Sequence, residues 1–170
     1  EMAFADQEDV FAVLEDVLPP IFAQYGTYNV ASTAPFRRIS YRDAMDKYGS
    51  DKPDLRIDLV LTDATEVMQG CGFAAFEGQT VKAIVVDATR KQIDAICAEV
   101  EVQTARKGFW FRVDENGEFV GGISKFLQDR KEEVIKALGL KNGDFVGLAA
   151  GKKLEAQKTA GVYRKLLGAA

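Results

Sequence analysis

The sequence predicts an α+β fold in which a mostly antiparallel sheet carries helices on one face and is flanked by further helical segments. One reason is Asn116-Gly117, which lies between two strand-like runs and is a dipeptide typical of a tight antiparallel hairpin. Another is that strand-like and helix-like segments interleave without the regular spacing of βαβ units. With 170 residues, of which 47% are hydrophobic, the chain is long enough to bury a substantial core.

Most of the expected helices carry a recognisable start signal. Asp6 and Ser40 are good N-cap residues, and Thr89 with Gln92 forms a capping box. Pro19-Pro20 is expected to end or kink the first helix, because proline removes a backbone donor and restricts the residue before it. The helices are expected to begin at Asp6, Ser40, Asp63, Thr89, Asp129 and residue 152.

Strands are expected where β-branched and aromatic residues concentrate. In Phe109–Val113, the alternation of side chains places Trp110 on the face opposite Phe109 and Phe111. The end of a strand is also expected at Glu1–Phe4. The complete strands are expected at Ile57–Leu61, Phe73–Phe76, Val81–Val86, Phe109–Val113, Phe119–Ile123 and Phe145–Ala149.

Composition excludes several classes of catalytic site. The chain has no histidine, which removes serine–histidine triads, imidazole general bases and the commonest zinc ligands. Its two cysteines, Cys71 and Cys97, lack a CxxC spacing and are expected to be reduced core thiols of a cytosolic protein. No apolar run reaches the ~18 residues needed to cross a bilayer, and no secretory leader is expected. We therefore predict no catalytic residue and no metal site in this sequence.

Charge is distributed unevenly along the chain. The formal net charge of −4 argues against nonspecific binding of nucleic acid through the overall electrostatic field. Residues 1–26 hold six acids and no base, whereas residues 151–170 hold five bases and one acid. The two ends are either solvated helix faces or complementary parts of one larger body.

The segment Phe36–Arg56 is the most distinctive part of the sequence. A capped helix begins at Ser40 and should end at Gly49, since glycine suits the left-handed position after a helix. A dense run of charge, Asp51–Arg56, follows where a plain connector would use small polar residues. The composition differs on either side of this run, so we interpret the segment as a junction between two structural units.

The same segment carries a family resemblance. Arg38–Met45, followed by Tyr48–Arg56 with the sequence YGSDKPDLR, resembles bacterial-type aspartyl-tRNA synthetases. Arg90–Asp94 and Ala160–Gly168 are similar to two further elements of that family, and a weaker likeness covers the rest of the chain. The connection at residues 87–89 is shorter than the glycine-rich loop usual in the family.

The resemblance implies a domain arrangement and an activity. Residues 1–56 would follow the second class II motif, residues 57–150 would form the GAD insertion domain with its α+β architecture, and residues 151–170 would return to the catalytic core. The family activates aspartate with ATP and Mg²⁺ and transfers it to the 3′ end of tRNA, as a homodimer in the cytoplasm. The second and third motifs would lie outside this sequence, so this fragment alone is expected to be inactive. Specificity for aspartate tRNA alone, or also for asparagine tRNA, stays open.

Three residues are candidates for substrate contacts under this resemblance. Glu1 matches a position whose carboxylate lines the aspartate and adenylate pocket, or it is simply an exposed terminal acid. Lys52 and Arg56 either contact phosphates of tRNA near its acceptor end, or pair with Asp51 and Asp54 to fix the junction.

Two further features allow a nucleic-acid contact or a purely structural role. Trp110 offers a stacking surface for a base, or it belongs to the core. Arg90 and Lys91 lie in the first turn of a helix, where cations are unfavourable unless an anion is near. That anion is either tRNA or the acids Asp87 and Asp94. We expect the inserted domain to brace the acceptor arm of tRNA and to contribute no catalytic group.

Two rival functions belong to different classes. A similar module occurs in the B subunit of the bacterial tRNA-dependent amidotransferase, but that enzyme predicts neither the segment Arg38–Arg56 nor the acidic first helix. The other rival is a free-standing interaction module without an enzymatic context. The coding sequence on either side distinguishes these possibilities, because only the ligase has a second class II motif upstream and a third downstream.

Overall fold

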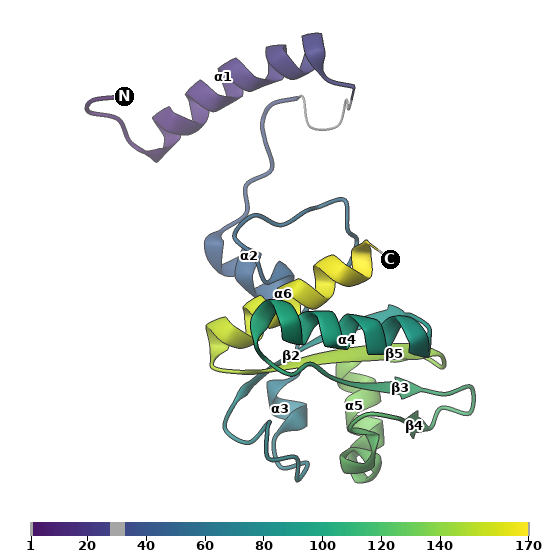
Figure 1. The fold of residues 1–170 in the computed structure, drawn as a ribbon. Helices are drawn as coiled ribbons and strands as arrows, with labels where there is room; N and C mark the ends of the chain where they lie inside the picture. Colours follow the sequence, from purple (N-terminus) through teal and green to yellow (C-terminus); the bar gives the residue numbers. More distant parts are fainter. Residues whose placement is uncertain (1, 28–32, 170) are drawn as a thin grey trace. The chain divides into compact units, whose positions relative to one another are not determined.

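The computed structural model describes residues 2–27 and 33–169, and these separate into two compact units, residues 1–39 and residues 40–170. Among the described residues, the first unit contains one helix and an extended segment, and the second contains the sheet with the remaining helices (Figure 1). The helices and strands are α1 (Gln7–Tyr25), α2 (Tyr41–Tyr48), β1 (Thr62–Asp63), α3 (Thr65–Met68), β2 (Thr80–Asp87), α4 (Arg90–Thr104), β3 (Phe109–Val113), β4 (Phe119–Val120), α5 (Lys131–Leu138), β5 (Asp144–Gly151) and α6 (Lys153–Gly168).

Helix α1 of the first unit begins as the sequence predicts. Asp6 accepts a hydrogen bond from the Glu8 amide at 2.8 Å, and a complete capping box joins Asp6 and Asp9. The helix does not end at Pro19-Pro20, however, but continues to Tyr25. It buries none of its residues within the described chain, so the carbonyls that lose a partner at the prolines lie where water can satisfy them.

The extended segment of the first unit returns along α1. The Phe36 amide donates to a carboxylate oxygen of Glu15 at 2.9 Å, and the Arg38 guanidinium pairs with Glu8 at 2.7 Å. The strand end expected at Glu1–Phe4 is wrong for the described residues 2–4, since Phe4 has a left-handed φ of 57°.

The sheet of the second unit is five-stranded and antiparallel, with the order β1-β2-β5-β3-β4. The predicted strands at 81–86, 109–113 and 145–149 are confirmed as β2, β3 and β5, and the hairpin at Asn116-Gly117 connects β3 to β4. Strands β2 and β5 pair along their whole length, from Thr80 opposite Gly151 to Asp87 opposite Asp144. The α+β class and the antiparallel sheet are therefore confirmed.

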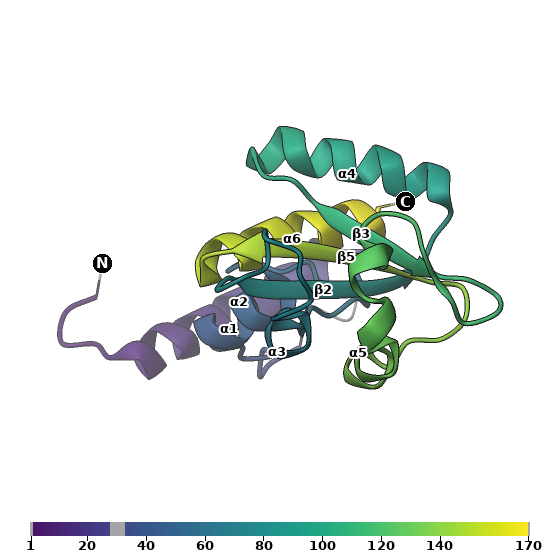
Figure 2. The ribbon, with the colours of Figure 1, turned by 90° about the horizontal axis from the view of Figure 1, so that it is seen from below.

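Helices cover both faces of the sheet, which corrects the expectation of helices on one face only. Figure 2 shows α4 and α6 on one side of the sheet and the shorter α3 and α5 on the other. Alternation along the strands explains the two layers, because each strand directs successive side chains to opposite faces. Val81, Phe111 and Val146 belong to the core beneath α3 and α5, whereas Ile84 and Ala149 belong to the core beneath α4 and α6.

Two expected strands are wrong. Residues 57–61 are not in a strand, and β1 consists of Thr62–Asp63 alone. Residues 73–76 form a turn in which the Phe76 amide donates to the Phe73 carbonyl at 2.9 Å. The aromatic rings of this turn pack in the core, with the centroids of Phe73 and Phe109 5.1 Å apart. The aromatic residues thus indicate burial and not an extended backbone.

Several boundaries also differ from the prediction. Strand β4 stops at Val120 because Gly121 and Gly122 turn the chain with φ values of 74° and 46°. The helix expected from Asp129 is preceded by two short 3-10 helices, η2 (Ser124–Phe126) and η3 (Gln128–Arg130), and α5 begins at Lys131.

Candidate nucleic-acid interface

Helix α2 lies against α6 at a contact between two glycines. Gly49 ends α2 with a φ of 67°, as expected of a left-handed cap. A Cβ built on Gly161 of α6 would lie 2.8 Å from the carbonyl carbon of Gly49, which is too close for any side chain. The two backbones therefore approach closely only because both residues are glycine, and this contact fixes the end of α2 on α6.

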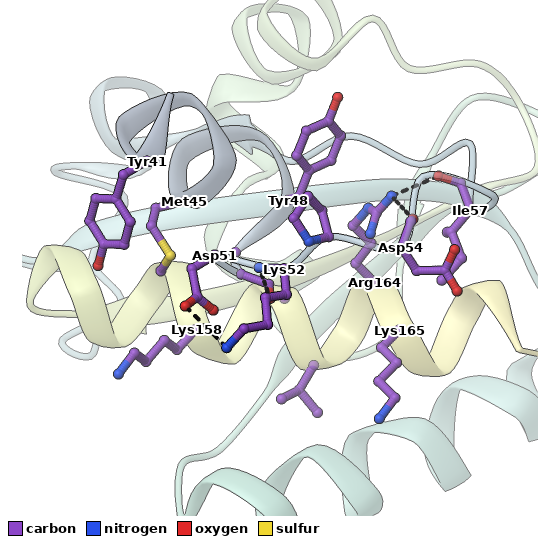
Figure 3. Close-up of a pocket in the computed structure, with 15 residues that line it drawn as sticks. Tyr41, Met45, Tyr48, Asp51, Lys52, Asp54, Ile57, Lys158, Arg164 and Lys165 are labelled. Carbon is purple, nitrogen blue, oxygen red and sulfur yellow. Dashed lines mark hydrogen bonds and ion pairs between the residues drawn. The ribbon is translucent and has the colours of Figure 1, made fainter. Parts of the chain in front are cut away.

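Arg164 of α6 holds the segment that follows α2, which we call the strap (residues 54–61). The Arg164 side chain is buried, with only 3% of its surface exposed. Its guanidinium donates to the carbonyls of Asp54 at 2.9 Å, Ile57 at 2.7 Å and Leu59 at 2.6 Å, and it lies 4.8 Å from the centroid of the Tyr48 ring (Figure 3). Burial lowers the pKa of this guanidinium, although arginine stays charged at any ordinary pH. The strap is thus shaped by one buried cation and not by a strand ladder.

A second buried cation, Lys82 of β2, ties α2 to the sheet. Lys82 is buried, with 3% of the residue's surface exposed, and its ammonium lies 3.1 Å from the carboxylate of Asp63 of β1 and 3.4 Å from that of Asp46 of α2. Gln157 of α6 donates to the same Asp46 carboxylate at 2.6 Å. Four elements therefore meet at one carboxylate–ammonium cluster, whose members satisfy one another.

The carboxylates around these cations are held in their charged form. Burial alone would raise the pKa of Asp46, but the hydrogen bond from Gln157 and the charges of Lys82 and Lys153 outweigh it, so the pKa is lowered. Hydrogen bonds from Arg56 lower the pKa of the exposed Asp54 to about 2.

Residues 41–57 and helix α6 enclose a groove of about 570 Å³ (Figure 3). Figure 3 shows Arg164 turned toward the strap, while Lys158 and Lys165 extend from α6 into open space. Lys52 enters from the loop after α2, and the ring of Tyr41, a residue that is 65% exposed, stands at the edge of the groove. A concave surface with several exposed ammonium groups favours polyanions such as nucleic acid over a small neutral ligand.

Lys52 and Arg56, the two predicted nucleic-acid residues, lie on this loop and on the strap. The Lys52 ammonium is 3.6 Å from a carboxylate oxygen of Asp51, and Arg56 pairs with Asp54 at 2.6 Å. The pairing suggested as the structural alternative is therefore present at both residues. Exposed ion pairs of this kind contribute at most about 1 kcal/mol, so they do not prevent either cation from meeting a phosphate, and that contact stays a prediction. Glu1, the predicted pocket residue, lies outside the described residues.

The other candidates for nucleic-acid contact, Trp110 and Arg90, both contact neighbouring side chains or backbone. Trp110 projects from the face opposite Phe109 and Phe111, as the alternation predicts, and its indole lies so close to Gly121 that a Cβ there would clash with the ring. Its ring centroid is 6.0 Å from that of Phe145. In the first turn of α4, the Arg90 guanidinium is 3.9 Å from the Asp94 carboxylate.

Sequence reasoning missed the role of α6. It counted Arg164 only as one of the five bases of residues 151–170 and did not place Lys158 and Lys165 beside Lys52. One signal was available, because residues 157, 161, 164 and 168 form a stripe of glutamine, glycine, arginine and glycine at helical spacing. Such a stripe of small and polar residues is typical of a helix face that another backbone approaches closely.

The described residues contain no group of three or more His, Cys, Asp or Glu side chains that could hold a metal ion. Both cysteines are free and half-buried, and burial raises the pKa of the Cys97 thiol. Within the same residues, no helix has both the length and the apolar character required to span a bilayer. The groove offers charge and shape for binding.

Comparison with known families decides what the sheet unit is. The family model of the GAD domain matches residues 73–160, which is just over half of the chain. The chain belongs to the GAD domain family. The matched residues run from the turn before β2 to the middle of α6, so the match includes most of the buried core residues on each face of the sheet.

Curated relatives match well beyond the GAD domain. An aspartate–tRNA ligase of Streptomyces avermitilis is 41% identical over 96% of this chain, and an aspartate–tRNA(Asp) ligase of Deinococcus radiodurans is 42% identical over 98%. An aspartate–tRNA(Asp/Asn) ligase of Zymomonas mobilis is 40% identical over 99% of the chain. The chain spans 29% of the length of the first two relatives and 30% of the third.

Proposed function

We propose that this chain is the GAD-containing segment of an aspartate–tRNA ligase, an aminoacyl-tRNA synthetase that joins aspartate to tRNA at the expense of ATP. The observation that carries this proposal is the continuity of the match, which covers 96% or more of the chain at about 40% identity. The match therefore includes residues before 73 and after 160, which the GAD domain itself does not explain. The amidotransferase alternative accounts only for the GAD domain and is disfavoured for that reason.

The proposed division of labour follows from what the segment contains. Adenylate formation with ATP and Mg²⁺ requires cationic groups on the phosphates and carboxylates on the metal, and we assign these to the rest of the ligase. In this proposal residues 1–56 and 151–170 belong to the catalytic domain in sequence, and residues 57–150 form the inserted GAD domain. The GAD match extends to residue 160, so the inserted domain and the returning segment overlap in the first half of α6. The packing of α2, the strap and α6 on the sheet supports an extensive junction between them.

We assign the inserted domain a role in holding tRNA near its acceptor end. The exposed cations of the groove, which lie on the two segments that flank the inserted domain, support a tRNA contact at its edge, because phosphate contacts supply much of the affinity of proteins for nucleic acids. Lys52 and Arg56 are proposed phosphate contacts, and Glu1 is proposed to line the aspartate pocket. The whole ligase is proposed to act as a cytoplasmic homodimer. The relatives include both tRNA(Asp) and tRNA(Asp/Asn) ligases, so either specificity fits this segment.

The test separates the two steps of the reaction in a full-length ligase that contains this segment. Aspartate-dependent exchange of pyrophosphate into ATP measures adenylate formation, and aspartylation of tRNA measures both steps. The variant replaces residues 57–150 by a flexible linker, which keeps the segments that the proposal assigns to the catalytic domain. We expect exchange to persist and the KM for tRNA to rise.

Three results would contradict the proposal. If the segment alone, residues 1–170, catalyses exchange, then the assignment of the reactive groups to the rest of the ligase is wrong. If exchange and aspartylation fall equally after replacement, the inserted domain only holds the ligase together. If the intact protein supports amidation of misacylated tRNA and no aspartylation, the amidotransferase alternative is correct.

A further inference from the structure

The groove beside α6 has a local charge opposite to that of the chain. Although the chain carries a net charge of −4, the groove brings together four cationic and two carboxylate side chains. Two of these charges are already committed, since Arg164 is bound to the strap carbonyls and Asp54 to Arg56. Asp51 lies 3.6 Å from Lys52, which leaves the two lysines of α6 as the excess positive charge.

Lys158 and Lys165 have neither a hydrogen bond nor an ion pair from their side chains to any described residue. Both are exposed on the same side of α6, seven residues apart, which places them two helical turns or about 10.5 Å from each other. A sugar–phosphate backbone carries one negative charge per nucleotide, so two lysines at this separation can contact different phosphates of the same strand. The spacing therefore suits a sugar–phosphate backbone lying along α6.

The wall opposite these lysines is fixed in advance. Gly49 and Gly161 hold the end of α2 against α6, and Arg164 holds the strap through three carbonyls. Lys52 and Tyr41 are consequently carried on a rigid support at the opposite rim of the groove. A preformed cationic wall loses little conformational freedom when a polyanion binds.

We propose that this groove binds the sugar–phosphate backbone of RNA, with Lys158 and Lys165 as the principal phosphate contacts, Lys52 as a third, and Tyr41 packed against the strand at the rim. The ligand class follows from unpaired ammonium groups on a preformed surface, and lysine ammonium groups recognise phosphate without reading base sequence. The inference rests on the proposed function, because that function makes tRNA the RNA in question.

The test measures binding of the whole 170-residue chain to a fluorescein-labelled RNA hairpin with a duplex stem and a single-stranded 3′ end, by fluorescence anisotropy at two salt concentrations. The double variant K158E/K165E should bind at least tenfold more weakly and should show a shallower salt dependence, by about 0.7 to 0.9 in slope for each lost phosphate contact. The matched control is K107E/K141E, which changes the net charge equally at two exposed lysines outside the groove. The control should lose less than threefold.

The proposal is overturned if the unaltered chain does not bind the hairpin at low salt, if K158E/K165E binds normally, or if the control loses as much affinity as the groove variant. Circular dichroism of each variant confirms that the fold is kept. The same variants placed in the full-length ligase separate this inference from the proposed function. A raised KM for tRNA with unchanged pyrophosphate exchange supports both the groove contact and the ligase assignment. Normal aspartylation by K158E/K165E would disprove the groove contact and leave the ligase assignment intact.

Discussion

Replacement of Arg164 by methionine tests whether one buried cation holds the strap. Methionine keeps an unbranched apolar side chain but removes the guanidinium that bonds the carbonyls of Asp54, Ile57 and Leu59 at 2.6 to 2.9 Å. Hydrogen bonds that involve a charged group contribute about 1.5 to 3 kcal/mol each, and three bonds to one group are not additive. The three residues whose carbonyls are bonded are themselves half-buried or exposed, so water can replace part of what is lost. We therefore expect a loss of about 3 kcal/mol in the free energy of unfolding.

Urea unfolding followed by the fluorescence of Trp110 measures this loss. Trp110 is the chain's single tryptophan and lies in the sheet unit, so the signal reports the unit that contains Arg164. The matched control is K165M, which makes the same replacement at the neighbouring exposed residue and should change the free energy of unfolding by less than about 0.5 kcal/mol. Arg164→Lys should fall between the two, because a compact ammonium cannot reach three carbonyls in a fork. An Arg164→Met variant as stable as K165M would refute the account of the strap.

Three other predictions concern separate features. Gly161→Ala should lower the free energy of unfolding of the second unit by about 1 to 3 kcal/mol in urea, because the new Cβ would clash with the backbone of Gly49. The same replacement inside an unobstructed helix would raise the free energy of unfolding by up to about 1 kcal/mol. The free energy of unfolding should fall as the pH drops from about 5 toward 2, because the pKa of Asp54 is about 2 in the folded chain and near 4 in the unfolded chain. Asp54→Asn should flatten the dependence of the urea midpoint on pH in this window. A variant with the same pH profile as the unaltered chain would contradict this prediction. Iodoacetamide at pH 8 should alkylate Cys97 in the folded chain more slowly than it alkylates a free thiol, because burial raises the pKa of Cys97. As a control, Cys97 in the urea-denatured chain should react at the same rate as the free thiol.

The parts of the fold that follow from local chemistry could be predicted from the sequence. The caps at Asp6, Ser40 and Thr89 are each observed with the expected hydrogen bonds, because capping depends on residues only two or three positions apart. Gly139 likewise ends α5 in the left-handed region with a φ of 64°. Strands β2 and β5 were predictable for a different reason, since both are central and buried and therefore rich in apolar residues.

The parts decided by tertiary contacts could not be predicted in this way. The run Phe73–Phe76 has the composition of a strand, but its rings are needed beneath β3, and a turn places them there. The strap has the apolar content of a strand, but Arg164 takes the carbonyls that a neighbouring strand would otherwise have used. In both cases a residue far along the chain decides the backbone conformation, and no local pattern reports it.

The same limitation explains why the candidate site was only partly predictable. The sequence drew attention to Lys52 and Arg56 through an unusual run of charge, and these residues do lie beside the groove or on the strap that forms its wall. The opposite wall comes from α6, more than a hundred residues later, and nothing local indicates that the two segments meet. The contact of Gly49 with Gly161, the burial of Arg164 and the hydrogen bond from Gln157 to Asp46 bring them together.

Helix α6 therefore connects the GAD domain core to the groove. Its buried residues Tyr163 and Leu167 complete the core beneath α4, beyond the last residue matched by the family model at 160. The neighbouring Arg164 holds the strap, and Lys158 and Lys165 line the groove. Because these side chains share one rigid helix, a ligand that displaces the groove wall must also strain the packing of α6 on the sheet. We infer that RNA bound along α6 would be positioned by the whole sheet unit and not by a mobile loop, which is the property that a bracing domain requires.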